Sequence, residues 1–398
     1  MSDYKNIYGK FNGNEAEYAL RALDSETPEN KAFQWVQKLE ETFANTIGSK
    51  YAIAVNSGTS GLHAALYAAG VNPGDEVIQP AKTVVMDAYV TLHMGAVPVF
   101  ADICPNSWNI DPKKIEEKIT SKTKAIIVVS LYGLPVDIAP IMDLAAKHNL
   151  VVIDDSAETL MTRYKDGFAG THADIAVYSF EKSKHMTSGS EGGMMIMSDE
   201  NLAVRARKFA GIGYKGLTAE AGRTSLASSV YQDPDYERFD TIGFNYRMNA
   251  ITAAIGLAQF ERIDFLVNRR KEVGKMFLDA VKGCDWIETQ EIPDYSDHSY
   301  FTFGMLYNGE KALGISWKEF YNLYKEMGGD GFYACWKPPY IEPSLRGKKY
   351  GDQLFEYGLC PIAEEYQKKI MAFKSNYRNL DEAKIQSDIL SELIKKIS

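Results

Sequence analysis

Short apolar runs alternate with helical patterns between residues 52 and 197. The runs typical of strands are Ala52–Val55, Glu76–Gln79, Val97–Ala101, Ala125–Leu131, Leu150–Asp154, Ile175–Phe180 and Gly193–Met197. They are continuous rather than alternating, as expected of strands that are buried on both faces of a sheet. Strands that alternate with helices favour a mostly parallel sheet wrapped by helices. The pattern therefore predicts an α/β fold for this part of the chain.

Helix-capping signals lie between several of these runs. Asp111 before Pro112 is typical of an N-cap followed by the first helical residue. Asp137 is predicted to cap the helical pattern that runs to His148.

The pattern changes after Gly213. Residues 214–241 are polar and show neither a helical nor a strand period. A stretch of this length inside a compact domain is usually a functional loop or a disordered one, and both interpretations stay open. Helical patterns return at 249–262 and 267–281, and a less regular mixture follows. We expect a large domain over residues 1–265, N-terminal segment included, and a smaller C-terminal α+β domain over residues 266–398.

Composition and charge narrow the class of protein. The chain has 398 residues, of which 45% are hydrophobic and 24% charged, and its formal net charge is -9. This balance is typical of a soluble globular protein, and without a basic run we expect no binding to nucleic acid or to a membrane surface. The N-terminal residues lack the pattern of a signal peptide. Four scattered cysteines and six dispersed histidines predict neither a disulfide framework nor a metal site, so we expect a cytoplasmic protein.

The first candidate for chemistry is the segment Asn56–His63, which follows a predicted strand and opens a predicted helix. Its glycines allow a ligand to approach the backbone, and the N–H groups of a helix start favour an anion. Thr59 and Ser60 add hydroxyl donors. The segment could therefore cradle a phosphate, although taken alone it is more typical of an ordinary strand–helix turn.

Two acids, Asp154 and Asp155, end a predicted buried strand, where a parallel sheet collects its ligands. One carboxylate could keep a heteroaromatic nitrogen protonated through a charge-assisted hydrogen bond. Alternatively, either acid could cap the next helix, and this is our interpretation of Asp154.

A lysine-containing loop follows the predicted strand Ile175–Phe180 and leads to Gly192 and Gly193. A buried lysine with a lowered pKa can act as a nucleophile and a base. Lys184 is the candidate for this role, whereas Lys182 is interpreted as a solvated side chain.

Together these segments resemble the DegT/StrS-type sugar aminotransferases, which have the aspartate-aminotransferase fold. The resemblance runs from roughly Gln34 to Glu364. It is carried by Ser57-Gly58-Thr59-Ser60-Gly61-Leu62, Pro73-Gly74-Asp75-Glu76-Val77-Ile78, Asn109-Ile110-Asp111-Pro112, Leu131-Tyr132-Gly133, Asp155 with Glu158, Ser179-Phe180 with Lys184, Glu191-Gly192-Gly193, Gly243–Asn249 and Cys360–Glu364.

The resemblance implies a pyridoxal 5'-phosphate cofactor, with pyridoxamine 5'-phosphate as the form that carries the amino group. Lys184 would hold the cofactor covalently, Asp155 would pair with its pyridine nitrogen and keep the ring an electron sink, and Glu158 would lie near its 3-oxygen. The residues expected to hold the phosphate are Gly58, Thr59, Ser60, Ser179 and, from the neighbouring subunit, Asn245. The resemblance therefore also implies a homodimer with shared active sites.

The implied reaction moves an amino group from glutamate to a keto sugar, with a nucleotide-linked 4-keto-6-deoxy sugar as the expected acceptor. The acceptor's diphosphate needs cations, which an acidic protein must gather locally. Candidate substrate-binding residues are His185, Arg223, Arg238 and Arg247.

Three departures from the family pattern weaken the prediction of the substrate more than the prediction of the cofactor. Val84 stands where the family has an aromatic residue that stacks on the pyridine ring, and Ser130 replaces a histidine. Residues 214–241 form a longer stretch than the family predicts.

A sugar dehydratase on the same scaffold is an alternative, but it would carry histidine in place of Lys184. A keto-cyclitol aminotransferase and a non-catalytic cofactor-binding sensor also stay open.

Overall fold

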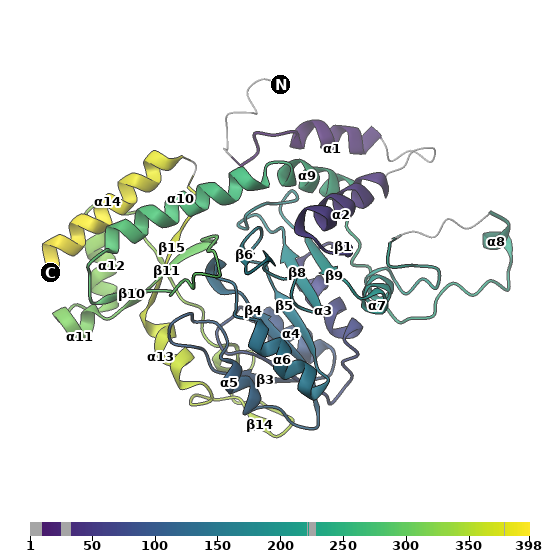
Figure 1. Ribbon diagram of the computed structural model, residues 1–398, viewed down its shortest axis with the longest axis horizontal. Helices are drawn as coiled ribbons and strands as arrows, with labels where there is room; N and C mark the ends of the chain where they lie inside the picture. Colours follow the sequence, from purple (N-terminus) through teal and green to yellow (C-terminus); the bar gives the residue numbers. More distant parts are fainter. Residues whose placement is uncertain (1–9, 25–32, 221, 223–227, 378) are drawn as a thin grey trace.

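The computed structural model describes residues 10–24, 33–220, 222, 228–377 and 379–398. In this part of the chain all seven predicted strands form one sheet in the order β1-β9-β8-β5-β4-β2-β3 (Figure 1). The strands are β1 Tyr51–Val55, β2 Glu76–Pro80, β3 Val97–Ala101, β4 Thr123–Val129, β5 Val151–Asp155, β8 Ile175–Ser179 and β9 Gly193–Met197. The predicted boundaries are correct to within two residues at every end.

The sheet is mostly parallel, which confirms the predicted α/β class. β3, β2, β4, β5 and β8 pair in parallel, whereas β9 runs antiparallel to both β1 and β8. In the register, Val129 lies beside Asp155, and Asp155 lies beside Val177. The carboxyl ends of β4, β5 and β8 therefore meet at one edge of the sheet.

Helices cover both faces of this sheet, which explains why its strands are continuous apolar runs. Ile127 and Ile153 point to the face covered by α3 and α7, whereas Tyr178 and Met194 point to the face covered by α2 and α9. Val152 packs on that second face with α5 and α6. The helices of this part are α1 Glu15–Asp24, α2 Phe33–Ile47, α3 Gly58–Ala68, α4 Met86–His93, α5 Pro112–Glu116, α6 Ala139–His148, α7 Glu200–Ala210 and α9 Ala250–Phe260.

One of the two capping predictions is confirmed. The Asp111 side chain accepts a hydrogen bond from the N–H of Lys113 and caps α5. The prediction for Asp137 is wrong, because α6 begins after Ile138 without a side-chain cap. Asp137 instead accepts a hydrogen bond from the Tyr164 hydroxyl at 2.5 Å.

The C-terminal part has a sheet of its own, in the order β10-β11-β15-β12, with antiparallel pairs. Its strands are β10 Ile287–Thr289, β11 Thr302–Tyr307, β12 Tyr333–Ala334 and β15 Ile370–Lys374, and its helices are α10 Ile263–Val281, α11 Gly309–Leu313, α12 Trp317–Glu326, α13 Pro361–Lys369 and α14 Leu380–Ile397. The predicted division at residue 265 falls inside α10. This helix packs Leu266 into the core of the large sheet and Phe277 into the aromatic core of the second sheet.

Residues 214–241 are called the arm below, and their described part around α8 extends away from the body of the molecule (Figure 1). A bridge between Tyr214 and Phe239 closes the base of the arm, and the N–H of Lys215 donates to the carbonyl of Arg238. The short helix α8 Ser228–Gln232 lies near its tip. Two small ladders complete the structure, β6 Arg163–Tyr164 with β7 Gly167–Phe168 and β13 Lys349–Tyr350 with β14 Gln353–Leu354.

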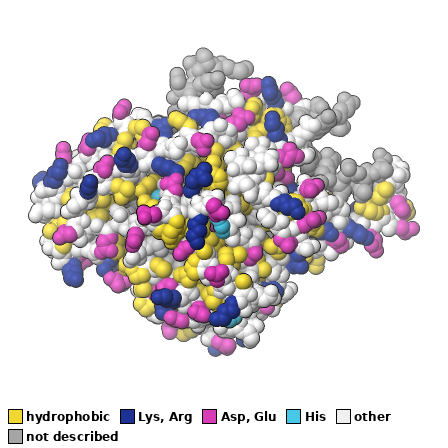
Figure 2. All heavy atoms as spheres, in the orientation of Figure 1, with side chains coloured by type: hydrophobic (Ala, Val, Ile, Leu, Met, Phe, Trp, Pro, Cys, Tyr) yellow, Lys and Arg dark blue, Asp and Glu magenta, His cyan; other side chains and the backbone are white. Residues whose placement is uncertain are grey.

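Basic and acidic side chains are interspersed on the face drawn in Figure 2. Within the described ranges, the structure contains no helix with the length and apolar character needed to cross a membrane.

Candidate active site

A cavity of about 1000 Å³ lies at the edge of the large sheet where β5 and β8 end. Its lining also includes the start of α3 and residues of β11 and β15, so both sheets contribute to it. Parallel sheets collect ligands at this edge, because loops after neighbouring strands diverge there. The cavity brings together Asp155, Glu158, Ser179 and Lys184, which lie at the ends of β5 and β8 or in the segments that follow them.

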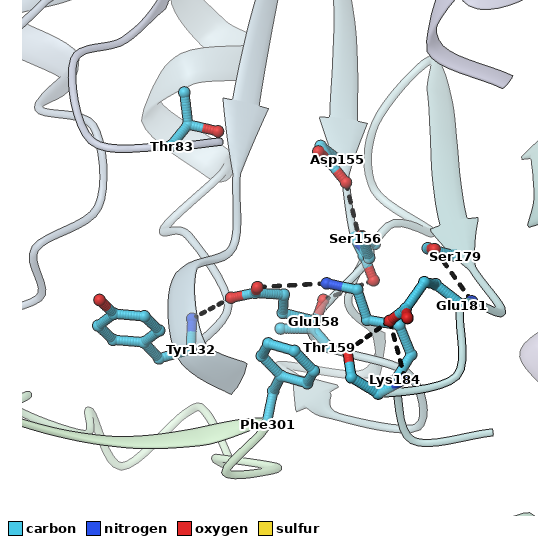
Figure 3. A network of polar contacts seen from close by, with 12 residues as sticks. Thr83, Tyr132, Asp155, Ser156, Glu158, Thr159, Ser179, Glu181, Lys184 and Phe301 are labelled. Atoms are coloured by element: carbon cyan, nitrogen blue, oxygen red, sulfur yellow. Dashed lines mark hydrogen bonds and ion pairs between the residues drawn. The ribbon is translucent and has the colours of Figure 1, made fainter. Parts of the chain in front are cut away.

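Glu158 connects the candidate lysine to the backbone of a neighbouring strand end. Its Oε1 lies 3.3 Å from Nζ of Lys184, and its Oε2 accepts a hydrogen bond of 2.8 Å from the N–H of Tyr132 (Figure 3). Nζ of Lys184 also lies 4.1 Å from the centre of the Phe301 ring. The lysine amine is therefore held over an aromatic face and beside a carboxylate, both in the cavity wall.

Asp155 is buried at the end of β5, and its Oδ1 accepts a hydrogen bond of 3.0 Å from the N–H of Ala157. Burial raises the pKa of this carboxyl to about 6, while the Lys184 charge acts in the opposite direction. A cationic partner in the cavity would therefore favour the ionised carboxylate.

Asp154 does not cap a helix, so our interpretation of this residue is wrong. No helix directly follows β5 among the described residues, and Asp154 points to the other side of the sheet. The hydroxyl of Ser130 lies 3.4 Å from its Oδ1, and burial raises the pKa of Asp154 to about 7. The departure at Ser130 is thus part of a buried contact beneath the cavity.

The N-terminus of α3 presents two candidate phosphate residues to the cavity, Gly58 and Thr59. Their N–H groups have no acceptor among the described residues, which leaves them available to an anion. A Cβ added to Gly58 would lie 3.1 Å from Cβ of Ser179, so glycine lets the helix start approach the end of β8. Ser60 is placed differently: its hydroxyl contacts Asn56 and Ser57 within the capping box, and it does not line the cavity.

Two cations that sequence reasoning missed hold the loop around Lys184. Arg270 of α10 donates to the carbonyls of Ser183 and Lys184 and, at 2.7 Å, to the carbonyl of Phe301. Nζ of Lys10 donates to the carbonyls of Lys182 (2.6 Å) and Lys184 (2.8 Å). Burial lowers the pKa of Lys10 to about 7. No sequence motif marks either residue, because both meet the loop only through the tertiary fold.

His185 lies behind the lysine loop rather than in the cavity lining, contrary to its predicted role in substrate binding. Its Nε2 is 3.3 Å from the carbonyl of Ser299, and the side chain is buried. Burial and the nearby Arg270 charge hold the pKa of this imidazole well below its ordinary value. Lys184 and His185 point to opposite sides of the loop, so the position of His185 next to Lys184 in the sequence does not place it in the cavity. The Lys182 side chain is exposed, as expected.

Arg238, Arg247 and the predicted phosphate residue Asn245 do not line the cavity of their own chain. Arg238 is on the arm, 5.5 Å from the Tyr236 ring centre. Arg247 lines a separate cavity of about 190 Å³, and Asn245 is an exposed residue beside Gly211. Arg223 lies outside the described residues.

Val84 lines the cavity at the position where an aromatic was expected. Aromatic side chains that line it from other elements are Tyr132, Phe301, Tyr333 and Trp336. No group of three or more His, Cys, Asp and Glu side chains in the described part of the chain is arranged to hold a metal ion.

The family model of the DegT/DnrJ/EryC1/StrS aminotransferase family matches residues 11–387. The chain is 40% identical over 267 residues to a GDP-perosamine synthase of Caulobacter vibrioides, covering 67% of both chains. It is 39% identical over 294 residues to a GDP-perosamine synthase of Escherichia coli O157:H7, covering 74% of this chain and 75% of the relative. The solved aminotransferase of Psychrobacter cryohalolentis superimposes with a TM-score of 0.84 at 27% identity, over 96% of this chain and 97% of that one. The chain therefore belongs to the DegT/DnrJ/EryC1/StrS aminotransferase family.

Proposed function

We propose that this protein is a pyridoxal-phosphate-dependent aminotransferase that moves an amino group from glutamate to a nucleotide-linked keto sugar. The observation that carries the proposal is the arrangement in one cavity of Lys184, paired with Glu158, next to the buried carboxyl of Asp155. Membership of an aminotransferase family supports the same conclusion.

The residues present fit this cofactor. An amine, a buried carboxyl and the free N–H groups at the start of α3 are the three features that bind an aldehyde, a pyridine nitrogen and a phosphate. When bound, the cofactor supplies an electron sink for the substrate carbon that loses a proton. Gly58, Thr59 and Ser179 would hold its phosphate.

The chain's own residues then have distinct tasks. Lys184 would carry the proton between the substrate carbon and the cofactor, and Glu158 would hold the lysine amine in place between transfers. Asp155 would keep the pyridine nitrogen protonated, which its burial permits because a cationic partner offsets the cost of ionising the carboxyl. Arg270 and Lys10 would fix the backbone from which Lys184 extends.

The volume of the cavity supports an acceptor larger than an amino acid. Two relatives that are about 40% identical are GDP-perosamine synthases, which favours a nucleotide-linked 4-keto-6-deoxy sugar. Asn245 and Arg238 lie outside the cavity of their own chain, and a homodimer in which they complete the partner's site would give them a role.

The experiment follows the two half-reactions on the purified protein loaded with pyridoxal phosphate. Glutamate should consume the aldehyde absorbance and release one equivalent of 2-oxoglutarate per site. A GDP-linked 4-keto-6-deoxy sugar should then restore the absorbance and yield the aminated sugar by mass spectrometry. Other keto-sugar nucleotides and free keto-cyclitols form the comparison panel. If the protein releases no 2-oxoglutarate, it is not a glutamate-dependent aminotransferase. If only a keto-cyclitol restores the aldehyde absorbance, the acceptor is a cyclitol and not a sugar nucleotide.

A further inference from the structure

A buried lysine, Lys82, has no part in the mechanism described above. It lies in the loop between β2 and α4, and its exposed fraction is only 4%. Together with Cys335 it lines a recess of about 40 Å³. The recess shares Tyr132, Glu158 and Lys184 with the large cavity, so it is the narrow inner end of the same site.

The neighbours of the Lys82 amine are poor partners for a cation. Nζ of Lys82 donates to Sγ of Cys335 and lies 5.4 Å from the centre of the Tyr132 ring. Among the described residues no carboxylate oxygen comes within 4.0 Å of this nitrogen. A buried ammonium without a counter-ion is costly, and a thiol sulfur and one aromatic face offset only a part of that cost. Asp155 and Glu158 also line the recess, but neither carboxyl reaches the Lys82 amine, so this amine favours an anion from outside the chain.

The other cations that line the recess and the large cavity are occupied, including Lys374, which is paired with Asp330. Lys184 is paired with Glu158, and the Arg270 guanidinium donates to three backbone carbonyls and to the Ser375 hydroxyl. Lys82 is the remaining lysine of this recess, and its amine has three N–H donors, of which Cys335 takes one.

We propose that Lys82 binds a carboxylate group of a substrate in this recess, an inference that rests on the proposed function and specifies its ligand. The volume of the recess favours a carboxylate, because a water needs only about 10–15 Å³ of such volume and the recess therefore has room for a few heavy atoms, whereas a nucleoside diphosphate fits only the larger cavity. The carboxylate has two possible sources, the amino donor and a keto sugar with an acidic substituent. In either case Lys82 fixes the end of the substrate that lies deepest in the site.

The test compares Lys82→Met and Lys82→Gln with wild type, all loaded with pyridoxal phosphate. Methionine keeps the length of the side chain and removes the charge, and glutamine also keeps a donor for Cys335. Lys122→Met is the control, because the Lys122 side chain is 59% exposed. Glutarate is the binding probe, measured by calorimetry. Each half-reaction is then titrated separately, with glutamate, with a neutral 4-keto-6-deoxy sugar nucleotide and with a keto-uronate sugar nucleotide.

If the donor supplies the carboxylate, both Lys82 variants weaken glutarate binding and raise the half-saturating glutamate concentration about tenfold to a hundredfold, with the limiting rate little changed. If the acceptor supplies it, the same loss is confined to the keto-uronate. In both cases the affinity for the cofactor and the half-saturating concentration of the neutral sugar nucleotide are unchanged, and Lys122→Met behaves as wild type.

The inference is overturned if wild type transaminates and both Lys82 variants bind glutarate, glutamate and the keto-uronate within twofold of it. It is equally overturned if the variants lose cofactor binding and limiting rate together, because Lys82 then supports the fold. If wild type fails to transaminate but binds glutarate through Lys82, only the proposed function fails.

Discussion

The cofactor end and the acceptor end of the site differ in how many of their residues come from a single chain. At the cofactor end, Asp155, Glu158 and Lys184 lie in one cavity and are held by hydrogen bonds and an ion pair. Two predicted residues lie outside that cavity: Arg238, expected to bind the acceptor, and Asn245, expected to hold the phosphate of the partner's cofactor. We infer that the fold of one chain fixes the amine and the carboxyls that carry the chemistry, whereas the phosphate contact of Asn245 and the binding of the acceptor depend on residues that a second chain brings.

Replacing the lysine should have the largest effect at the cofactor end. Lys184→Ala removes both the covalent anchor and the proton carrier, so turnover should fall by roughly 10⁴-fold or more. Borohydride treatment followed by mass spectrometry should find no cofactor fixed to the variant chain. Cofactor that is still trapped on Lys184→Ala would assign the role to another lysine, with Lys182 as the first to examine.

Asp155→Asn should have the next largest effect and should act in both half-reactions. An amide cannot hold the pyridine proton, so the rate should fall on the order of 10²–10³-fold, while the fold persists. Stopped-flow rates with glutamate and circular dichroism would measure the two quantities. Near-wild-type rates would mean that Asp155 serves only its bond to the Ala157 N–H.

A smaller and more selective effect is expected on the arm. Arg238→Ala should weaken use of the keto-sugar nucleotide about tenfold to a hundredfold, because a charged contact to the diphosphate is lost. The glutamate half-reaction should be unchanged, and the same is expected of Arg223→Ala. If both half-reactions fall together in steady-state titrations, the arm supports the fold or the cofactor, and the contrast between the two ends is lost.

The last effect leaves turnover aside and concerns stability beneath the cavity. The pKa of Asp154 is raised to about 7, so the stabilisation that its protonated form provides is present at low pH and is lost as the pH rises through 7. Asp154→Asn cannot ionise, so its unfolding free energy relative to wild type should rise by on the order of 2–3 kcal/mol from pH 5 to pH 8. Urea unfolding at both pH values measures this, with the exposed Asp352→Asn as control. A pH-independent difference would contradict the raised pKa.

The sequence predicted the strands and the residues at their ends, but not the contacts made by residues far away in the chain. The seven strands and the residues that follow them were predictable, because apolar runs mark buried strands and parallel strands end at one edge. Lys10, Lys82 and Arg270 were not, because their contacts with Lys182–Lys184 and Cys335 span 86 to 253 residues of sequence.

Two individual predictions failed for local reasons. His185 follows Lys184 directly but turns into the core, and Asp154 precedes Asp155 on the opposite face of its strand. In both pairs, neighbouring residues point in opposite directions, so a motif that places one residue in the cavity says little about the next.

The most direct test of the division between the two ends is complementation between two inactive variants, Lys184→Ala and Asn245→Ala. In a mixed dimer with shared sites, one site carries both changes and the other carries neither. After subunit exchange, proven by mass spectrometry of differently tagged chains, activity should return to about a quarter of wild type, because half of the dimers are mixed and each has one intact site of two. No recovery despite proven exchange would place Asn245 in the site of its own subunit or outside any site, and would contradict the account.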